Sequence, residues 1–462
     1  MYYKVYDRIE MKLETNNDKF TVMTETPVEK LVCRLAIPSI MTMLISSIYN
    51  MADTYFVGSL GTSAVGAVGI VFPLMSVIQA LGFLFGQGSG NYMSRELGAQ
   101  NYEKASKMAA TGFFSALIVG GTLSIIGLLF SAPLAIALGA TPTILPYAKE
   151  YMLFILIGMP WMAASLVLNN QLRFQGSSLY GMIGMLSGAI LNIILDPIFI
   201  FVLEFGIKGA SMATMISQAV GCSVLLIGCS RKGNISIRPS NFSPSFSNYR
   251  EIFRGGSPSL VRQGLMGVMG IVINRFAVVY GDAAVAAISI VNRVCMFAQS
   301  AVMGVGQGFQ PVCGFNYGAK RYDRVKRAFW FCIRLISVAL TIICVFLAIY
   351  APQIIALFRK DDQEVINIGV RSLRIQCIGL PFTSWIILCN MMMQTIGKSL
   401  QASFLALSRQ GLFLVLFLFT LAPHFGLLGI QISPAASNIA SFFIAIPLGI
   451  NVLRKMSAKP TG

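Results

Sequence analysis

The sequence has few of the residues on which soluble enzymes and metal proteins depend. Only 18 of its 462 residues are Asp or Glu, and its one histidine is His424. That leaves little material for a histidine-based metal site or a histidine-dependent hydrolase, and no carboxylate cluster suggests another enzyme. The nine cysteines include no CxxC pair and no metal-ligand spacing, so we interpret them as small buried apolar residues. We therefore expect no catalytic activity and no cofactor.

Charged residues of both signs are also scarce, at 11% of the chain compared with roughly 25% in an ordinary soluble domain. The net charge of +17 comes from Lys and Arg residues that occupy short gaps between apolar blocks. A nucleic-acid-binding protein concentrates such residues on one face or arm, so the sequence argues against a nucleic-acid partner. Residues 1–30 are polar and lack the apolar core and cleavage site of a signal peptide.

Hydrophobic residues make up 55% of the chain and fall in blocks of about twenty, the length that crosses the hydrocarbon core of a bilayer. Twelve such blocks predict an all-α integral membrane protein with twelve transmembrane helices. They lie near residues 35–57, 64–92, 107–130, 146–169, 179–203, 209–229, 258–280, 284–312, 328–351, 371–392, 400–422 and 428–453.

The distribution of Lys and Arg between the loops predicts the orientation in the membrane. One set of loops and ends carries roughly 27 basic residues and the other roughly six, and the richer side faces the cytoplasm. An even number of helices then places both termini in the cytoplasm. We expect an unstructured cytoplasmic leader over 1–25, a first helix capped by Thr26 with Pro27 at its first position, and a cytoplasmic tail over 456–462.

The two halves of the chain are related in sequence. Residues 38–105 align without a gap to 258–325, and 16 of the 68 positions are identical. Because each repeat holds six helices, both copies have the same orientation. We therefore predict two parallel six-helix bundles, 26–229 and 257–455, joined by a cytoplasmic linker over 230–256. Transporters with such repeats bind their substrate between the halves, so we expect a central cavity there.

Ionisable residues within apolar spans are functional candidates, because a charge inside a bilayer is costly. Asn192 and Asp196 are one helical turn apart and share a face, and Pro197 leaves a backbone carbonyl unpaired nearby. Hard cations prefer such oxygens, and Thr214 on the next span adds a hydroxyl. Asp53 on the first span is a second carboxylate. A lone aspartate can instead carry a proton.

Each of these candidates also has a purely structural explanation. An aspartate near a helix end can cap the helix or pair with a loop lysine, and a threonine can hydrogen-bond to its own helix. Gln87 and Gln307 lie in repeated Gly-Gln-Gly sequences whose glycines favour close helix packing, and both glutamines are candidates for lining the cavity. Arg275 and Arg293 either extend to the membrane surface or hold an anionic substrate or a counter-charge.

Five short motifs, in this order and together with the repeat, resemble the multidrug and toxic compound extrusion (MATE) transporters over roughly residues 26–455. The Arg-Gln-Gly sequence at 262–264 is similar to the MepA-like bacterial branch of that family. The motifs are Pro38-Ser39, Asp53-Thr-Tyr-Phe-Val-Gly58, Leu172-Arg173-Phe-Gln-Gly176, Asn192-x-x-x-Asp196-Pro197 and Pro311-x-x-Gly314-x-Asn316-Tyr-Gly-Ala319.

The resemblance implies a multi-pass protein of the bacterial inner membrane. It would act as an antiporter that exports drugs or other small cationic, amphipathic molecules in exchange for Na⁺ or H⁺ by alternating access. The family's ion ligands carry over onto Asp53, Asn192, Asp196 and Thr214. We expect a monomer whose partners are its substrate and the lipid bilayer. The alternative from the same superfamily is a flippase for a lipid-linked precursor, with Arg275 and Arg293 supplying a basic cavity.

Overall fold

The computed structural model describes residues 16–358 and 362–457, and the part that it describes is helical throughout, without β-strands. The helices are α2 (Asn16–Glu25), α3 (Val28–Gly58), α4 (Thr62–Gly98), α5 (Tyr102–Leu129), α6 (Ser131–Ala137), α7 (Leu145–Phe174), α8 (Ser178–Pro197), η1 (Ile198–Val202), α9 (Gly206–Cys229), η2 (Pro239–Asn241), α10 (Phe246–Val278), α11 (Asp282–Gly318), α12 (Tyr322–Ile349), α13 (Ala351–Ala356), α14 (Gln363–Gly379), α15 (Thr383–Thr395), α16 (Ser399–Leu407), η3 (Ser408–Leu412), α17 (Phe413–Phe425) and α18 (Leu427–Ser457).

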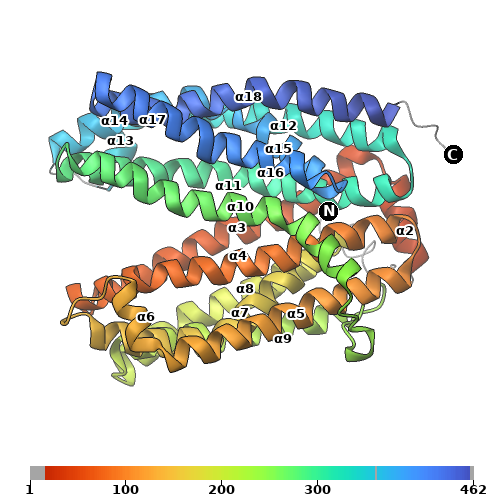
Figure 1. Ribbon diagram of the computed structural model, residues 1–462, viewed down its shortest axis with the longest axis horizontal. Helices are drawn as coiled ribbons and strands as arrows, with labels where there is room; N and C mark the ends of the chain where they lie inside the picture. Colours follow the sequence, from red (N-terminus) through yellow and green to blue (C-terminus); the bar gives the residue numbers. More distant parts are fainter. Residues whose placement is uncertain (1–15, 359–361, 458–462) are drawn as a thin grey trace, which may run out of the picture.

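These helices form two bundles that lie one above the other in Figure 1, α2–α9 below and α10–α18 above. Within the described residues, nine helical stretches are long and apolar enough to cross a membrane, and the bent pair α14–α15 makes a tenth. The helices α3 and α10, with 31 and 33 residues, complete the twelve predicted spans. The prediction of an all-α membrane protein built from two six-helix bundles is confirmed.

The repeat extends to helix lengths and to turn conformations. Helices α4 and α11 both have 37 residues, and α5 and α12 both have 28. The residue before α4 and the residue before α11 are glycines with φ of 107° and 90°, a region that only glycine adopts readily. Gln100 and Lys320, 220 positions apart, share a left-handed φ near the next turn. The two bundles are therefore copies of one supersecondary plan.

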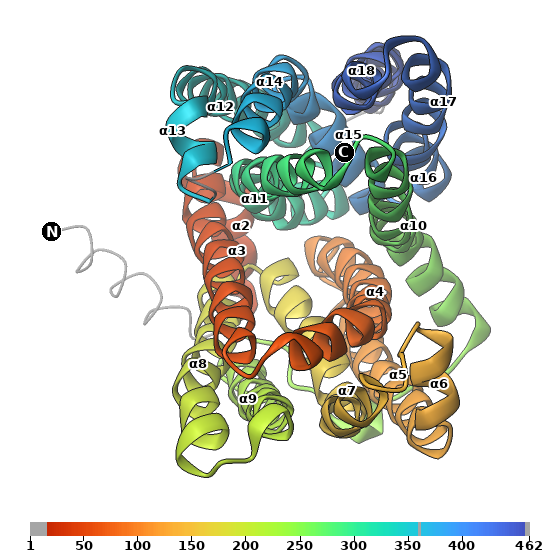
Figure 2. The same cartoon turned by 90° about the vertical axis from the view of Figure 1, so that its left-hand side faces the viewer.

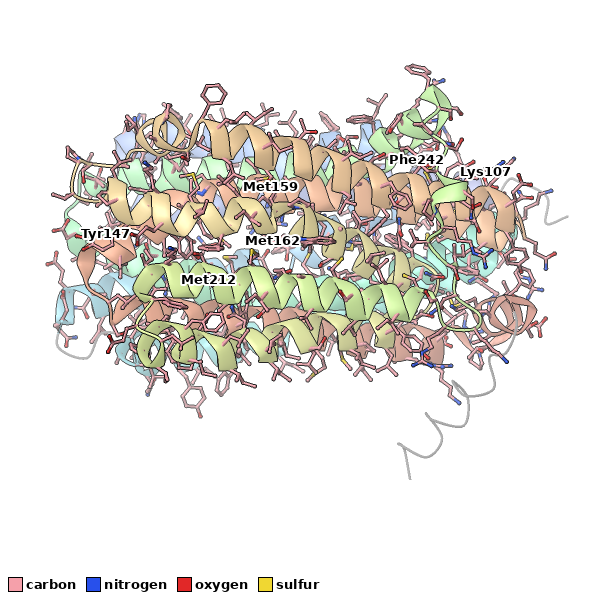
Figure 3. The ribbon with its side chains drawn as sticks, turned by 90° about the horizontal axis from the view of Figure 1, so that it is seen from below. Lys107, Tyr147, Met159, Met162, Met212 and Phe242 are labelled. Carbon is pink, nitrogen blue, oxygen red and sulfur yellow. The ribbon has the colours of Figure 1, made fainter. Side chains whose placement is uncertain are left out.

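One end of the molecule collects the turns after α4, α7, α11 and α15, together with the linker between α9 and α10. We call it the basic end. In Figure 3, which views the first bundle from below, Lys107 and Phe242 mark this end. Tyr147 marks the opposite end, Met159 and Met162 lie near the middle of α7, and Met212 lies on the part of α9 nearer Tyr147.

The two bundles meet through glycines in the half of the molecule nearer the basic end. A Cβ atom on Gly88 of α4 would lie 2.2 Å from the carbonyl oxygen of Ile252 on α10. One on Gly256 would lie 2.1 Å from the carbonyl oxygen of Leu84, and one on Gly308 of α11 would lie 2.6 Å from Ala36 of α3. Only residues without side chains let helix backbones approach so closely. This half of the interface is therefore closed.

The bundles separate toward the opposite end. Gly270 follows Ile252 by 18 residues, which is five full helical turns, so both lie on the same side of α10. Ile252 packs against α4, whereas a Cβ atom on Gly270, or on Gly267, would have no atom within 4 Å. The ribbons of α4 and α10 diverge in the same direction in Figure 1. The predicted central cavity is thus a cleft that is closed at the basic end and open at the other.

The prediction of an unstructured leader was wrong for residues 16–25, which form α2. Met23 of this helix is buried, and Lys19 is also buried through hydrogen bonds described below. Helix α3 begins at Val28 with Pro27 in the cap position, so Thr26 does not cap it as expected. The leader failed as an expectation because its order comes from contacts with both bundles, which are distant in sequence. Residues 1–15 and 458–462 lie outside the described residues.

Candidate ion and substrate site

The structure brings together three of the four predicted ion ligands. Asn192 and Asp196 lie on α8, and Thr214 lies on the adjacent helix α9. The amide nitrogen of Asn192 donates hydrogen bonds of 3.3 Å to Asp196 Oδ1 and of 3.3 Å to Thr214 Oγ1. All three side chains are buried, with exposures of 1% or less. They therefore form one oxygen-rich cluster inside the first bundle.

Small residues hold α8 and α9 close enough for this cluster to form. A Cβ atom on Gly188 would lie 3.0 Å from the carbonyl oxygen of Ser217, and one on Gly221 would lie 3.3 Å from that of Gly184. Pro197 follows the cluster and ends α8, and the chain continues as the π-helical turn η1. Proline removes a backbone donor, and single π turns are frequent at functional sites. The local sequence thus supplies both the close approach and the irregular backbone.

The orientation of the Asn192 amide leaves an oxygen available. Because its nitrogen donates to both neighbours, its Oδ1 points elsewhere, and this buried atom has no hydrogen-bond partner among the described residues. An unsatisfied buried acceptor is costly and calls for an explanation. The hydroxyl of Ser217, three residues after Thr214, is also buried without a partner. A bound cation would satisfy such oxygens.

The fourth predicted ligand, Asp53, lies on α3, which packs against α8. Its side chain is outside the described part of the structure, so its role as an ion ligand stays a prediction.

Gln87 lies inside a buried polar network. Its side chain donates to Asn170 on α7 at 3.1 Å and accepts from Gln310 on α11 at 3.3 Å, so it joins the two bundles. Arg173 donates to both Asn170 and Gln310, the latter at 3.5 Å. Gln307, the repeat partner of Gln87, lines a small cavity together with Arg173. Both glutamines therefore lie at the closed part of the interface between the bundles.

Arg275 and Arg293 are exposed, and neither takes part in the buried network. Three other arginines were missed as site residues. Arg173, which was assigned to a cytoplasmic loop, is in fact 3% exposed in the last turn of α7. Arg262 and Arg409 lie half-buried within the second bundle. Arg409 falls inside the predicted apolar span 400–422, so the cost of a charge in a bilayer was a signal that pointed to it.

Comparisons with known proteins agree with this description. The MatE family model matches residues 38–198 and 258–420, once in each bundle. The chain is 31% identical over 430 residues to the multidrug export protein MepA of Staphylococcus haemolyticus strain JCSC1435, covering 91% of this chain and 93% of that protein. MepA of Staphylococcus saprophyticus is 30% identical over 414 residues, covering 88% of this chain and 90% of that protein.

Solved structures show the same architecture. The crystal structure of MATE in complex with MaL6 matches with a TM-score of 0.90 at 27% identity, covering 95% of this chain and 99% of that chain. The outward-facing conformation of a multidrug resistance MATE family transporter matches with a TM-score of 0.89 at 27% identity, covering 95% and 98%.

The repeated bundles, the cleft between them and these matches define a secondary transporter. The chain belongs to the MatE family, and the resemblance seen in its sequence motifs is thereby confirmed.

Proposed function

We propose that the chain is an antiporter that exports drugs or other small organic molecules in exchange for Na⁺ or H⁺. The observation that carries this proposal is the buried cluster of Asn192, Asp196 and Thr214, which can hold a coupling ion, beside a cleft that opens at one end. The relatives named as multidrug export proteins support the export of drugs. In this proposal Asp53 completes the ion site from α3.

The proposed topology follows from charge. The basic end faces the cytoplasm, both termini lie there, and the chain acts as a monomer in the bacterial cell membrane. The cleft then opens to the outside. The bundles 26–229 and 257–455 are the units that rock against each other, and 230–256 is the linker between them. Gln87 and Gln307 lie at the closed part of this interface and would be uncovered when it opens inward.

The decisive experiment is transport in proteoliposomes. Purified protein should move a fluorescent organic molecule when a Na⁺ or H⁺ gradient is imposed, with a cationic and an acidic fluorophore tested side by side, and the gradient that drives uptake identifies the coupling ion. Asp196→Asn should abolish the gradient-driven component, because it removes the one carboxylate of the described cluster. Glu150→Gln, an exposed acidic residue on α7, serves as the matched control and should transport normally. Wild-type transport by Asp196→Asn at equal reconstitution would refute the ion site.

A further inference from the structure

Three arginines lie in the interior of the molecule, one at the interface between the bundles and two within the second bundle. Arg173 on α7 is buried, and Arg262 on α10 and Arg409 on η3 are half-buried. They come from both bundles and from three separate spans. A positive charge in the membrane-embedded part of a protein is costly, so three of them require a physical reason.

Arg262 lies at the middle of α10 and is half-buried. It follows Gly255 by seven residues, two helical turns, so both project from the same side of α10. A Cβ atom on Gly255 would lie 2.9 Å from the carbonyl oxygen of Gly88 on α4, which marks the closed interface. Gly267 and Gly270, further along α10, adjoin open space. Along the axis of α10, Arg262 therefore lies between the closed contact at Gly255 and the open space at Gly267 and Gly270. No described residue hydrogen-bonds with it.

Arg409 lies on η3, which packs on α10, the helix that carries Arg262. The π-helical turn η3 packs on α10, where a Cβ atom on Gly411 would lie 3.6 Å from Leu265. The guanidinium of Arg409 donates to Asn438 Oδ1 at 2.9 Å and to Gln299 Oε1 at 3.0 Å. Both acceptors are neutral amides, so they fix the position of the guanidinium without balancing its charge.

A further polar group close to this site has no partner. Ser441 lies three residues after Asn438 on α18, and residues with this spacing share one helix face. Its side chain is completely buried, and its hydroxyl has no hydrogen-bond partner among the described residues. The polar surface beside Arg409 therefore extends further than the two amides that hold the arginine.

Arg173 is the third positive charge, on the facing bundle. Its guanidinium donates to two amide oxygens, of Asn170 and Gln310, and its Nε is buried without a partner. It lines a small cavity with Ser39, Thr42, Asn169, Ser178 and Gln307. Arg173 therefore lies in the part of the interface that is closed in this conformation.

None of these three charges is balanced within the described residues. No carboxylate pairs with them there, and Arg262 repels both Arg173 and Arg409. Arginines at the basic end behave differently, since Arg95 lies 3.3 Å from Glu251 and other arginines there also have acidic partners. Withdrawing a positive charge from water without a counter-charge is unfavourable. The cluster is thus stable only at a free-energy cost that an anionic ligand would offset.

We propose that Arg262 and Arg409, with Arg173 on the facing bundle, bind the oxyanion of an organic acid that the protein transports. Guanidinium groups bind carboxylate, sulfonate and phosphate groups through paired hydrogen bonds, which suits a planar or tetrahedral oxyanion. The inference rests on the proposed export function and adds to it a substrate class, namely molecules with an acidic group. When the closed half of the interface opens, Arg173 offers a further positive charge to the bound oxyanion.

Binding of three matched naphthyl probes tests the proposal without any transport. Full-length protein in phosphatidylcholine nanodiscs is dialysed against 2-naphthoate, 2-naphthylmethanol or 2-naphthylmethylammonium. Naphthoate should bind at least about tenfold more tightly than the ammonium probe, as expected for charge-assisted hydrogen bonds. Arg262→Gln and Arg409→Gln should each weaken naphthoate binding by about tenfold or more while the alcohol binds as before. Arg334→Gln, an exposed arginine on α12, should bind like the wild type.

Several outcomes would overturn the site. Equal affinity of the wild type for the acid and the ammonium probe excludes an oxyanion preference, and unchanged naphthoate binding in both glutamine variants excludes these arginines. If a glutamine variant unfolds, the Arg262→Lys and Arg409→Lys variants replace it; they keep the charge but lose the paired geometry, so naphthoate should bind with intermediate affinity. Intermediate affinity supports the site, and wild-type affinity in both lysine variants excludes paired recognition.

A lipid arm identifies the source of the oxyanion. Part of the phosphatidylcholine is replaced by phosphatidylglycerol. Naphthoate binding should stay unchanged if the natural ligand is a soluble organic acid. If phosphatidylglycerol weakens naphthoate binding by competing for the site, the occupant is a lipid headgroup. Because binding is measured without an ion gradient, failure of coupled transport in proteoliposomes refutes the proposed antiport and leaves this result standing. Failure of naphthoate binding, in turn, leaves coupled export of other molecules untouched.

Discussion

At the scale of single residues, the two bundles place opposite chemistries inside the membrane. The first bundle buries a carboxylate, Asp196, among amide and hydroxyl groups. The second places the guanidinium of Arg409 next to two neutral amides. A cation and an organic anion would therefore occupy different bundles, which lets one conformational change act on both.

If Asp53 and Asp196 share one ion, their substitutions should not add. Asp53→Asn and Asp196→Asn should each remove most of the Na⁺- or H⁺-dependent transport, and the double variant should be no worse than the poorer single variant, because groups that act on one ligand are energetically coupled. The measurement is the ion dependence of transport in proteoliposomes for all three variants. Strictly additive losses in apparent ion affinity would instead establish two independent sites.

Gly256→Val should disturb the closed half of the interface. Its Cβ atom would lie 2.1 Å from the carbonyl oxygen of Leu84, so the bundles must move apart. Overpacking of this kind typically costs about 1–3 kcal/mol, and the melting temperature of the detergent-purified protein should fall accordingly. Gly270→Val is the control, because no atom lies within 4 Å of its Cβ position, and it should melt like the wild type. Equal melting of the two variants would contradict the glycine-mediated closure.

The sequence reveals those parts of the site whose residues lie close together along the chain. Asn192 and Asp196 were found because one helical turn separates them and Pro197 follows, all within six residues. The sequence predicts a loop position for Arg173 because it lies at the end of an apolar run, whereas one of its two hydrogen-bond acceptors, Gln310, belongs to the other bundle. No local pattern contains that contact. Arg409, by contrast, was within reach of the same reasoning that selected Asp196.

At the scale of elements, each bundle contains one π-helical turn next to an ionisable residue. The turn η1 follows Asp196 and Pro197, and η3 contains Arg409. Ser437 on α18 donates from its hydroxyl to the backbone carbonyl of Arg409, so the widened turn is tied to a neighbouring helix. A π turn rotates the following side chains relative to a regular helix. The backbone is therefore irregular next to Asp196 and at Arg409, one proposed ligand in each bundle.

Helix α2 joins both bundles at the basic end. Lys19 donates from its ammonium group to Ser177 at 2.7 Å, to the carbonyl oxygen of Gly233 at 2.9 Å and to Asn234. On its other side, the backbone carbonyls of Met23 and Thr24 accept hydrogen bonds from α11 and from the turn after it, at 3.1 and 2.8 Å. Opening of the basic end requires some of these bonds to break.

Lys19→Met should loosen α2. The substitution removes three hydrogen bonds from a charged donor, and each such bond typically contributes about 1.5–3 kcal/mol. It keeps the length of the side chain. Hydrogen–deuterium exchange of residues 16–25 and 230–241 should become faster. Lys30→Met, an exposed lysine on α3, serves as the comparison and should leave the exchange of both segments unchanged. If Lys19→Met exchanges like the wild type, α2 is held by its apolar side alone.

At the scale of the whole molecule, the parallel repeat accounts for both the cleft and its closure. Helices α3, α4, α10 and α11 line the interface, and they are repeat partners of one another in the two bundles. Figure 2, which looks onto the open end, shows these four helices between the outer helices of each bundle. Each bundle packs internally, so one can tilt as a rigid body against the other. Tilting about the glycine contacts would close the open end and open the basic end.

A cysteine pair at positions 70 and 270 tests this movement. Ile70 lies 18 residues before Gly88, and Gly270 lies 18 residues after Ile252, so both are five full turns, about 27 Å along the helices, beyond the same contact between the bundles. In the conformation described here α10 has open space at Gly270. Inward opening should bring the two positions together, and a disulfide requires Cα atoms within about 7 Å.

The Ile70→Cys/Gly270→Cys pair is introduced in a background without the nine native cysteines. Oxidation should then trap the inward-facing conformation. The disulfide should form only while substrate and an ion gradient keep the transporter cycling. Transport should stop on oxidation and return on reduction, whereas each single-cysteine variant should transport throughout. Crosslinking detected by the mobility shift on a non-reducing gel must rise in parallel with the loss of transport. Full transport with a complete crosslink would show that the two bundles do not separate and close at this level, and the rigid-body mechanism would then be wrong for this protein.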